Sequence, residues 1–140
     1  MSGLFLEDLS VGQSAELTRT VAEADVVAFA DVSGDHNPVH LDEAFAATTP
    51  FKTRIAHGML SGAYISALIA GKLPGPGAIY LSQNLVFKRP VKLGDEVTVT
   101  VTITAIDEAK ARVTLATVCT VGGKTVVDGE AVIMASRKAA

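Results

Sequence analysis

The segment from Ser33 to Asp42, Ser-Gly-Asp-His-Asn-Pro-Val-His-Leu-Asp, holds the residues best suited to chemistry. Asp35 and His40 lie five positions apart across a loop that Asn37-Pro38 constrains, because the residue before a proline avoids helical geometry. Such a loop can turn both side chains toward one point, where a carboxylate and an imidazole act on one water as a general acid/base pair. Burial and the partner's charge can tune the carboxylate, and Asn37 could orient either group by a hydrogen bond.

Spacing alone leaves two other interpretations of this loop open. Asp35 and Asn37 can form an Asx turn, with His40 as an ordinary surface or core histidine, and spacing alone favours this turn because Asp-x-Asn-Pro is common in turns. Alternatively, His36, His40 and Asp35 could bind a metal ion, although no strong ligand motif is present.

A second candidate site lies in Ile55-Ala-His-Gly-Met-Leu60, at the start of the longest predicted helix. A glycine there, Gly58, would leave its backbone N–H open, and amides at a helix N-terminus favour an anion or a polarised carbonyl oxygen. This is the oxyanion site that an enolate-forming reaction needs. The same residues support an alternative equally well, in which Gly58 only allows tight helix packing and His57 caps the helix. Ser66 is either a hydrogen-bond donor to the site or a small packing residue, and packing is the default.

Helices and strands must position these groups. The pattern predicts a strand over 14–20, a helix over 22–33 that ends at Gly34, a loop over 35–40 and a short helix over 43–48 capped by Asp42. A long helix, small or apolar on every side, is predicted over 57–71 and ends at the Pro-Gly repeats of 73–77. Strands are predicted over 78–88, 95–106, 111–121 and 124–135.

The strand at 95–106 alternates valine or isoleucine with threonine, which predicts a sheet with one dry face. Short connections predict that the last four strands form an antiparallel meander. An apolar helix must be covered nearly all round, and a curved antiparallel sheet wrapped around it would do so. The expected fold class is α+β in the hot-dog arrangement, as one domain over 1–140. An edge strand could pair with its copy, which predicts a homodimer.

Composition excludes several classes. The chain has 140 residues, is 49% hydrophobic and carries a net charge of −3, so it is neither disordered nor suited to nucleic acid. Its single cysteine, Cys119, excludes an internal disulfide and a cysteine-based zinc site. The uncharged stretch 55–71 contains polar residues and glycines, which favours a buried helix over a membrane span. No signal segment is apparent, and a cytoplasmic location is expected.

The segment Ser33–Asp42 resembles the hydratase motif of the MaoC-like (R)-specific enoyl-CoA hydratase family. His57-Gly58-Met59, the segment 87–91 and Gly94-Asp95 also sit where that family has them. The resemblance extends from about residue 8 to 135, with no departure at the fixed motif positions and His36 at a variable one. It outweighs the turn-only interpretation of Asp35 and His40.

The resemblance implies reversible syn hydration of a trans-2-enoyl-CoA to an (R)-3-hydroxyacyl-CoA. Asp35 and His40 would activate the water and Gly58 N–H would stabilise the enolate oxygen. Asn37, Ser66 and His57 would support the pair. The implied chemistry needs no metal or redox cofactor, since coenzyme A carries the substrate.

The acyl chain is expected beside the central helix, with Ile65, Ile69, Ile133 and Met134 as pocket candidates and a preference for short to medium chains. Lys52, Arg54, Lys88 and Arg89 could meet the coenzyme A phosphates, although each alone is more simply a solvated charge. The alternatives are a related dehydratase acting on a dicarboxylic acyl-CoA or an acyl-carrier protein, a hot-dog thioesterase, and a non-catalytic acyl-CoA binding module.

Overall fold

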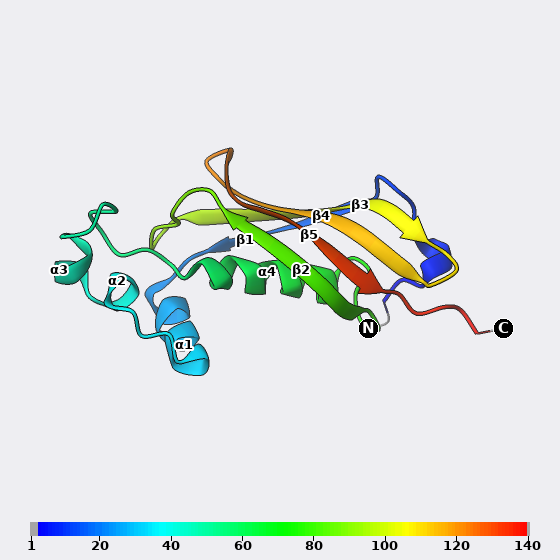
Figure 1. Cartoon of the computed structure of the whole chain (residues 1–140), viewed down its shortest axis with the longest axis horizontal. Helices are drawn as coiled ribbons and strands as arrows, with labels where there is room; N and C mark the ends of the chain where they lie inside the picture. The colour runs from blue at the N-terminus through cyan, green and yellow to red at the C-terminus, as the bar shows by residue number, and fades with distance from the viewer. Residues whose placement is uncertain (1–2, 140) are drawn as a thin grey trace.

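The computed structural model describes residues 3–139, in which a curved sheet packs on one long helix (Figure 1). The helices are the 3₁₀ turn η1 Leu6–Asp8, then α1 Glu23–Ser33, α2 Pro38–Leu41, α3 Glu43–Ala46 and α4 Gly58–Gly71. The strands are β1 Ser14–Thr20, β2 Ile79–Phe87, β3 Glu96–Asp107, β4 Arg112–Val121 and β5 Lys124–Met134. The α+β class is confirmed. In the described part of the chain no helix is long and apolar enough to cross a membrane.

The core lies between α4 and the sheet. Four side chains of β3 are at most 1% exposed and form the dry face that the valine–threonine alternation predicts: Val97, Val99, Val101 and Ile103. Against this face α4 buries Tyr64, Ile65, Leu68 and Ile69. The expectation that α4 is covered nearly all round is wrong for this chain, because Ala63, Ser66, Ala67 and Ala70 are exposed. Five strands cover one side of the helix, and small residues occupy the other.

The order of the strands differs from the predicted meander. The sheet runs β1-β3-β4-β5-β2 with antiparallel neighbours, so β2 lies at the edge beside β5, whereas β3 pairs with β1. The reason is that the connection from β2 to β3 forms backbone hydrogen bonds with β5 and with the segment before α4. Lys88 N–H donates to Val126 O at 2.8 Å, and Val91 O accepts from Ala56 N–H at 2.7 Å. The chain is therefore led away from β2 and past the start of α4.

The predicted loop over 35–40 contains a helical turn. Asn37 is the N-cap of α2, because its side-chain oxygen accepts from Val39 N–H at 3.2 Å, and Pro38 takes the first helical position, where no N–H is needed. The cap predicted at Asp42 is confirmed by a 3.1 Å bond from Phe45 N–H, although α3 ends at Ala46. Figure 1 shows α1, α2 and α3 gathered near the end at which α4 begins.

A substitution at Gly129 tests how closely β2 and β5 approach. A Cβ on Gly129 would lie 2.0 Å from the backbone oxygen of Asn84 in β2, so Gly129→Ala must push the two strands apart. We expect the free energy of unfolding to fall by about 2 kcal/mol or more, with a melting temperature lower by several degrees in thermal denaturation. Gly71→Ala is the matched control, because nothing lies within 4 Å of the added Cβ. Equal melting temperatures for the two variants would contradict this packing.

Candidate active site

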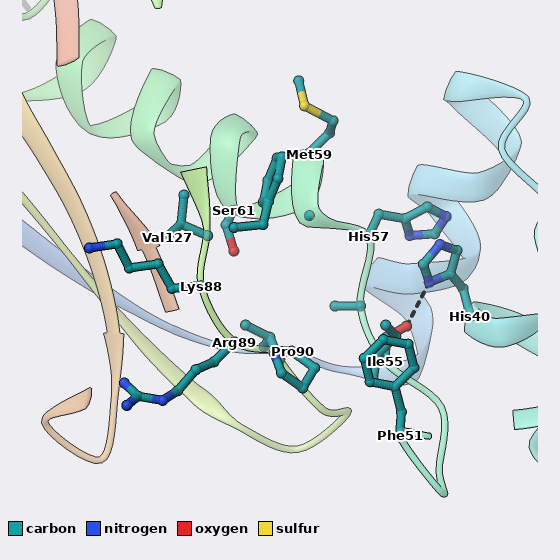
Figure 2. A pocket seen from close by; sticks show the side chains of 14 residues that line it. His40, Phe51, Ile55, His57, Met59, Ser61, Lys88, Arg89, Pro90 and Val127 are labelled. Carbon is teal, nitrogen blue, oxygen red and sulfur yellow. Dashed lines mark hydrogen bonds between the residues drawn. The ribbon is translucent and has the colours of Figure 1, made fainter. Parts of the chain in front are cut away.

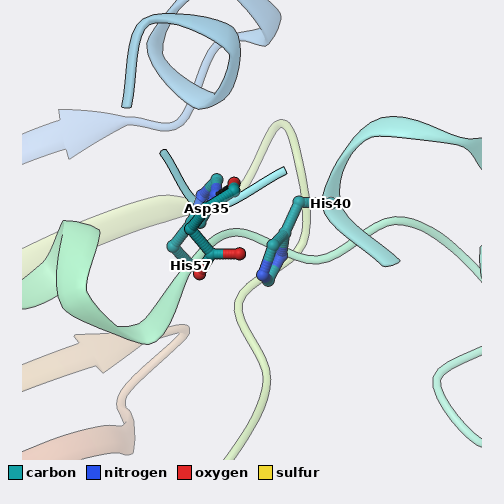
Figure 3. A group of neighbouring side chains, drawn as sticks. All are labelled: Asp35, His40 and His57. Carbon is teal, nitrogen blue, oxygen red and sulfur yellow. Dashed lines mark hydrogen bonds between the residues drawn. The ribbon is translucent and has the colours of Figure 1, made fainter. Parts of the chain in front are cut away.

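Three side chains from separate segments meet beside the start of α4. Asp35 comes from the loop after α1, His40 from α2, and His57 is the N-cap of α4. One oxygen or nitrogen of each lies within 4.8 Å of the others (Figure 3). Both histidines are buried, whereas Asp35 is exposed. The structure therefore brings Asp35 and His40 together and adds His57 to them.

Local hydrogen bonds shape the loop that carries Asp35. Gly34 ends α1 in the left-handed region at φ 81°, where glycine is favoured. Asp35 accepts from Asn37 N–H at 3.2 Å, so the Asx turn forms as well as the cluster. The oxygen of Asn37 caps α2, and no hydrogen bond joins the Asn37 side chain to Asp35 or His40 in the described chain. Asn37 thus supports the pair through the backbone.

Backbone carbonyls decide the tautomers of the two histidines. A carbonyl oxygen can only accept, so His40 Nδ1–H donates to Ile55 O at 2.8 Å and His57 Nε2–H donates to Asp35 O at 2.9 Å. In the neutral rings the lone pairs are therefore on His40 Nε2 and His57 Nδ1. His40 Nε2 is the nitrogen that can accept a proton from water, an assignment that spacing does not give.

The surroundings of His40 favour its neutral form. Burial lowers the pKa of His40 below its ordinary value of 6.5; the bond to Ile55 opposes this, the nearby His57 adds to it, and the Asp35 charge opposes it. The His40 and His57 rings stack with centroids 3.8 Å apart, and Phe29 lies 4.9 Å from His57 on a tilted plane. A neutral, oriented imidazole is ready to act as a general base.

Arg54 binds the backbone of His40 and thereby helps to position it. Its Nε–H donates to His40 O at 2.7 Å, and its guanidinium pairs with Glu23 of α1 at 2.7 Å. The side chain of Arg54 is only 15% exposed. Ile55 N–H adds a bond to Val39 O at 3.2 Å. Arg54 is therefore occupied as a link between α1 and α2, which sequence reasoning missed because the partner, a backbone carbonyl, has no sequence signal.

A cavity of about 420 Å³ opens beside His40 and His57 (Figure 2). Its walls are mostly apolar and include Phe51, Ile55, Ala56, Met59, Phe87, Pro90, Val91 and Val127, with Gly58, Ser61, Lys88 and Arg89 completing them. Gly58 is the first residue of α4, so its N–H has no acceptor within the helix. A Cβ at Gly58 would lie 2.6 Å from the Phe87 ring, so this wall needs glycine. The site thus combines a base, a carboxylate and an open amide beside an apolar space.

The family domain described as MaoC like matches residues 8–127. The chain belongs to the MaoC-like family. An (R)-specific enoyl-CoA hydratase from Rhodospirillum rubrum is 55% identical over 130 residues, which cover 93% of this chain and 90% of that protein. Unliganded R-hydratase PhaJ1 from Pseudomonas aeruginosa superposes with a TM-score of 0.92 at 58% identity, covering 97% of this chain and 88% of that one. An (R)-hydratase from A. caviae, described as involved in PHA biosynthesis, gives 0.90 at 50% identity, covering 92% and 98%. These structures confirm the hot-dog fold.

Several predicted residues of this MaoC-like chain lie away from the cavity. Ile65, Ile69 and Ile133 are at most 1% exposed and fill the space between α4 and the sheet, and Met134 packs against that core. None of these four predicted pocket residues lines the cavity. The reason is their position: Ile65 and Ile69 of α4 and Ile133 of β5 belong to the core between the helix and the sheet, whereas the cavity lies at the start of α4.

Of two serines on α4 in the MaoC-like chain, only one lines the cavity. Ser66 is exposed on α4 and does not line the cavity, whereas Ser61 does and is 3% exposed. Ser61 comes three residues after Gly58, a spacing that places side chains on the same helix face. This spacing could have identified Ser61 from the sequence.

Of the four predicted phosphate contacts, Lys88 and Arg89 line the cavity. Lys88 Nζ lies 3.4 Å from Asp128, and Arg89 donates to Thr125 O at 3.1 Å. Arg54 is committed to Glu23 and His40, and Lys52 is not part of the wall. Of the four predicted cations, Lys88 and Arg89 are therefore the two at the cavity wall.

Proposed function

We propose that this protein is an (R)-specific enoyl-CoA hydratase that adds water reversibly and syn to a trans-2-enoyl-CoA, giving an (R)-3-hydroxyacyl-CoA. The observation that carries this proposal is that Asp35 and His40 meet beside a mostly apolar cavity, whose wall includes His40 and Gly58. The names of the relatives from Rhodospirillum rubrum and Pseudomonas aeruginosa support the same reaction.

In the proposed reaction, water lies between Asp35 and His40. His40 Nε2 takes one proton as the water oxygen bonds to C3 of the enoyl group, while the Asp35 carboxylate accepts a hydrogen bond from the remaining O–H. The electron pair of the double bond moves to the thioester oxygen, where Gly58 N–H stabilises the enolate. A proton from the Asp35–His40 pair then bonds to C2 on the same face, which restores the site and makes the addition syn. This scheme uses no metal or redox cofactor.

The cavity supports an acyl thioester as the substrate. Its apolar walls suit a short to medium acyl chain, and Lys88 and Arg89 supply positive charge for the phosphates of coenzyme A. The proposal includes a cytoplasmic location, because acyl-CoA thioesters are made and consumed inside cells.

A homodimer is part of the proposal. β2 is an edge strand with exposed apolar side chains, among them Ile79 at 57% and Val86 at 55%. The exposed small side of α4 holds Ser66. Pairing of β2 with its copy would protect this edge and bury apolar surface. Light scattering after gel filtration should give twice the chain mass; a monomer at micromolar concentration would contradict it.

Incubation with crotonyl-CoA tests the function. Hydration should remove the enoyl absorbance, and the product should be oxidised by an R-specific 3-hydroxyacyl-CoA dehydrogenase and not by an S-specific one. Release of free thiol would identify a thioesterase instead. S product would contradict the stereochemistry. Activity only with the acyl-carrier-protein thioester would show that the acyl group is carried by that protein and not by coenzyme A.

The pH dependence of kcat/KM should show the protonation of His40. Because the base must be neutral, activity is expected to fall as pH decreases through the pKa of His40. Burial holds this pKa below 6.5, so the acidic midpoint should lie below that value. Initial rates with crotonyl-CoA between pH 4.5 and 8 would measure it. A midpoint above 6.5 would show that another group titrates or that His40 is more solvated.

Arg54→Gln should lower kcat about tenfold with little change in KM. The variant loses the bond to His40 O and the ion pair with Glu23, so His40 is held less well. Tenfold corresponds to about 1.4 kcal/mol, close to the lower end of the usual contribution of a hydrogen bond from a charged group. Arg89→Gln is the contrasting variant, because Arg89 lines the cavity and its loss should raise KM. A raised KM with normal kcat for Arg54→Gln would place Arg54 on the substrate.

A further inference from the structure

We propose that Asp35, His40 and His57 form an inhibitory binding site for a divalent transition-metal ion such as Zn²⁺. The ligands are a carboxylate oxygen of Asp35, Nε2 of His40 and Nδ1 of His57. Binding itself is independent of the proposed function, whereas inhibition rests on it. His36, which sequence analysis grouped with Asp35 and His40, is outside this cluster, because it is 55% exposed and pairs with Asp31 at 3.2 Å.

The three side chains are already close enough to converge on an ion. One oxygen or nitrogen of each lies within 4.8 Å of the others (Figure 3). Zn²⁺ binds such ligands at about 2.0–2.2 Å, which places tetrahedral ligand atoms roughly 3.3 Å apart. The ligand atoms must therefore approach one another by up to about 1.5 Å, and the ring planes must turn. The exposed Asp35 can make such a movement at little cost.

Both histidines have the hydrogen-bond pattern of metal ligands. A metal-bound imidazole typically donates its other N–H to a carbonyl or carboxylate, which fixes the tautomer and aims the lone pair. His40 Nδ1–H donates to Ile55 O at 2.8 Å, and His57 Nε2–H donates to Asp35 O at 2.9 Å. Each ring thus presents one nitrogen with a lone pair, as Zn²⁺ requires.

His57 Nδ1 gives the second, independent observation. His57 is 2% exposed, and within the described chain its Nδ1 has no hydrogen-bond partner. A buried lone pair without a donor is unfavourable, and nothing in the proposed reaction uses it. A cation would satisfy it. The stacked rings, 28° apart in plane, must tilt for both lone pairs to face one ion, and both rings lie at the wall of the cavity.

Metal binding and hydration need the same atom. His40 Nε2 is the base of the proposed reaction, and a lone pair that binds Zn²⁺ cannot accept a proton from water. The ion would also occupy the place of the water beside Asp35. Zn²⁺ should therefore inhibit reversibly by excluding the reactive water.

Titration with Co²⁺, followed by visible absorption, tests binding on the whole protein without any activity. We expect one ion per chain, no sulfur-to-cobalt band because Cys119 is fully buried, and displacement by Zn²⁺. His57→Gln and Asp35→Asn should each weaken binding at least tenfold. Asp35 is exposed, so Asp35→Asn remains informative if His57→Gln fails to fold. His36→Gln is the matched control and should bind normally.

Two binding results would overturn the site: no bound Co²⁺ at millimolar concentration, or loss in His36→Gln with normal binding in Asp35→Asn. Inhibition is tested separately. Saturating Zn²⁺ should abolish crotonyl-CoA hydration, and EDTA should restore it. Full activity with Zn²⁺ bound would overturn the inhibitory role. Bound Co²⁺ in a protein that never hydrates crotonyl-CoA would contradict the proposed function and support the site.

Discussion

His40→Gln should lower kcat for crotonyl-CoA hydration by at least about 10²-fold, the usual contribution of a positioned acid/base group. Glutamine can fill part of the space and donate an amide N–H to Ile55 O. It has no basic lone pair where His40 Nε2 stands, so the water keeps its proton as the bond to C3 forms. Steady-state kinetics would measure the loss, and an unchanged melting temperature would show that the fold is intact.

Asp35→Asn should give a loss of the same order, because the amide still accepts from Asn37 N–H but carries no charge to hold the water. The double variant should be little worse than either single variant, since groups that act as a unit are not additive. Lys138→Gln, which removes an ion pair with Asp8 far from the site, is the control. Near-normal turnover in either single variant would remove that residue from the mechanism.

Gly58→Pro should lower kcat by about 10²–10³-fold, the usual effect of losing one oxyanion donor. Proline removes the N–H of Gly58, and its ring stands where the substrate oxygen would lie. The helix tolerates it, because proline is favoured at the first helical position and His57 already has φ −60° and ψ 135°, which proline accepts in the preceding residue.

Gly58→Ala is the matched variant for this test. Its Cβ meets Phe87 just as the proline Cβ does, but the N–H remains. We expect Gly58→Ala to lose much less activity than Gly58→Pro. Any loss that comes from crowding of the Cβ against Phe87 should be equal in the two variants. Equal kcat values for the two variants would show that the amide does not stabilise the enolate and that crowding against Phe87 explains the loss. Circular dichroism would confirm that α4 is retained.

Comparison of single segments shows how far local pattern reaches. The strand Ser14–Thr20 and the alternation in β3 follow from the sequence, because the periods of strands and the turn residues between them are local properties. The pairing of β2 with β5 does not, since it depends on where the segment 88–95 finds hydrogen-bond partners. The turn α2 was predicted as a loop, although its cap by Asn37 and the proline at its first helical position are local signals.

The sequence alone determined the class of the fold, the start and end of most elements, and the candidate pair Asp35 and His40. The fold class and the elements follow from periodicity and turn residues in neighbouring positions, whereas spacing alone favoured a turn at Asp35 and His40 and the family resemblance implied their catalytic role. The tertiary structure decided which nitrogen of His40 is the base, that Arg54 holds His40 by its backbone, and that Ser61 rather than Ser66 lines the cavity. It also placed His57 beside the pair, 17 residues after His40. These four features depend on contacts between segments that are distant in the sequence, such as hydrogen bonds to particular carbonyls and the stacking of two rings. A local sequence pattern does not contain that information.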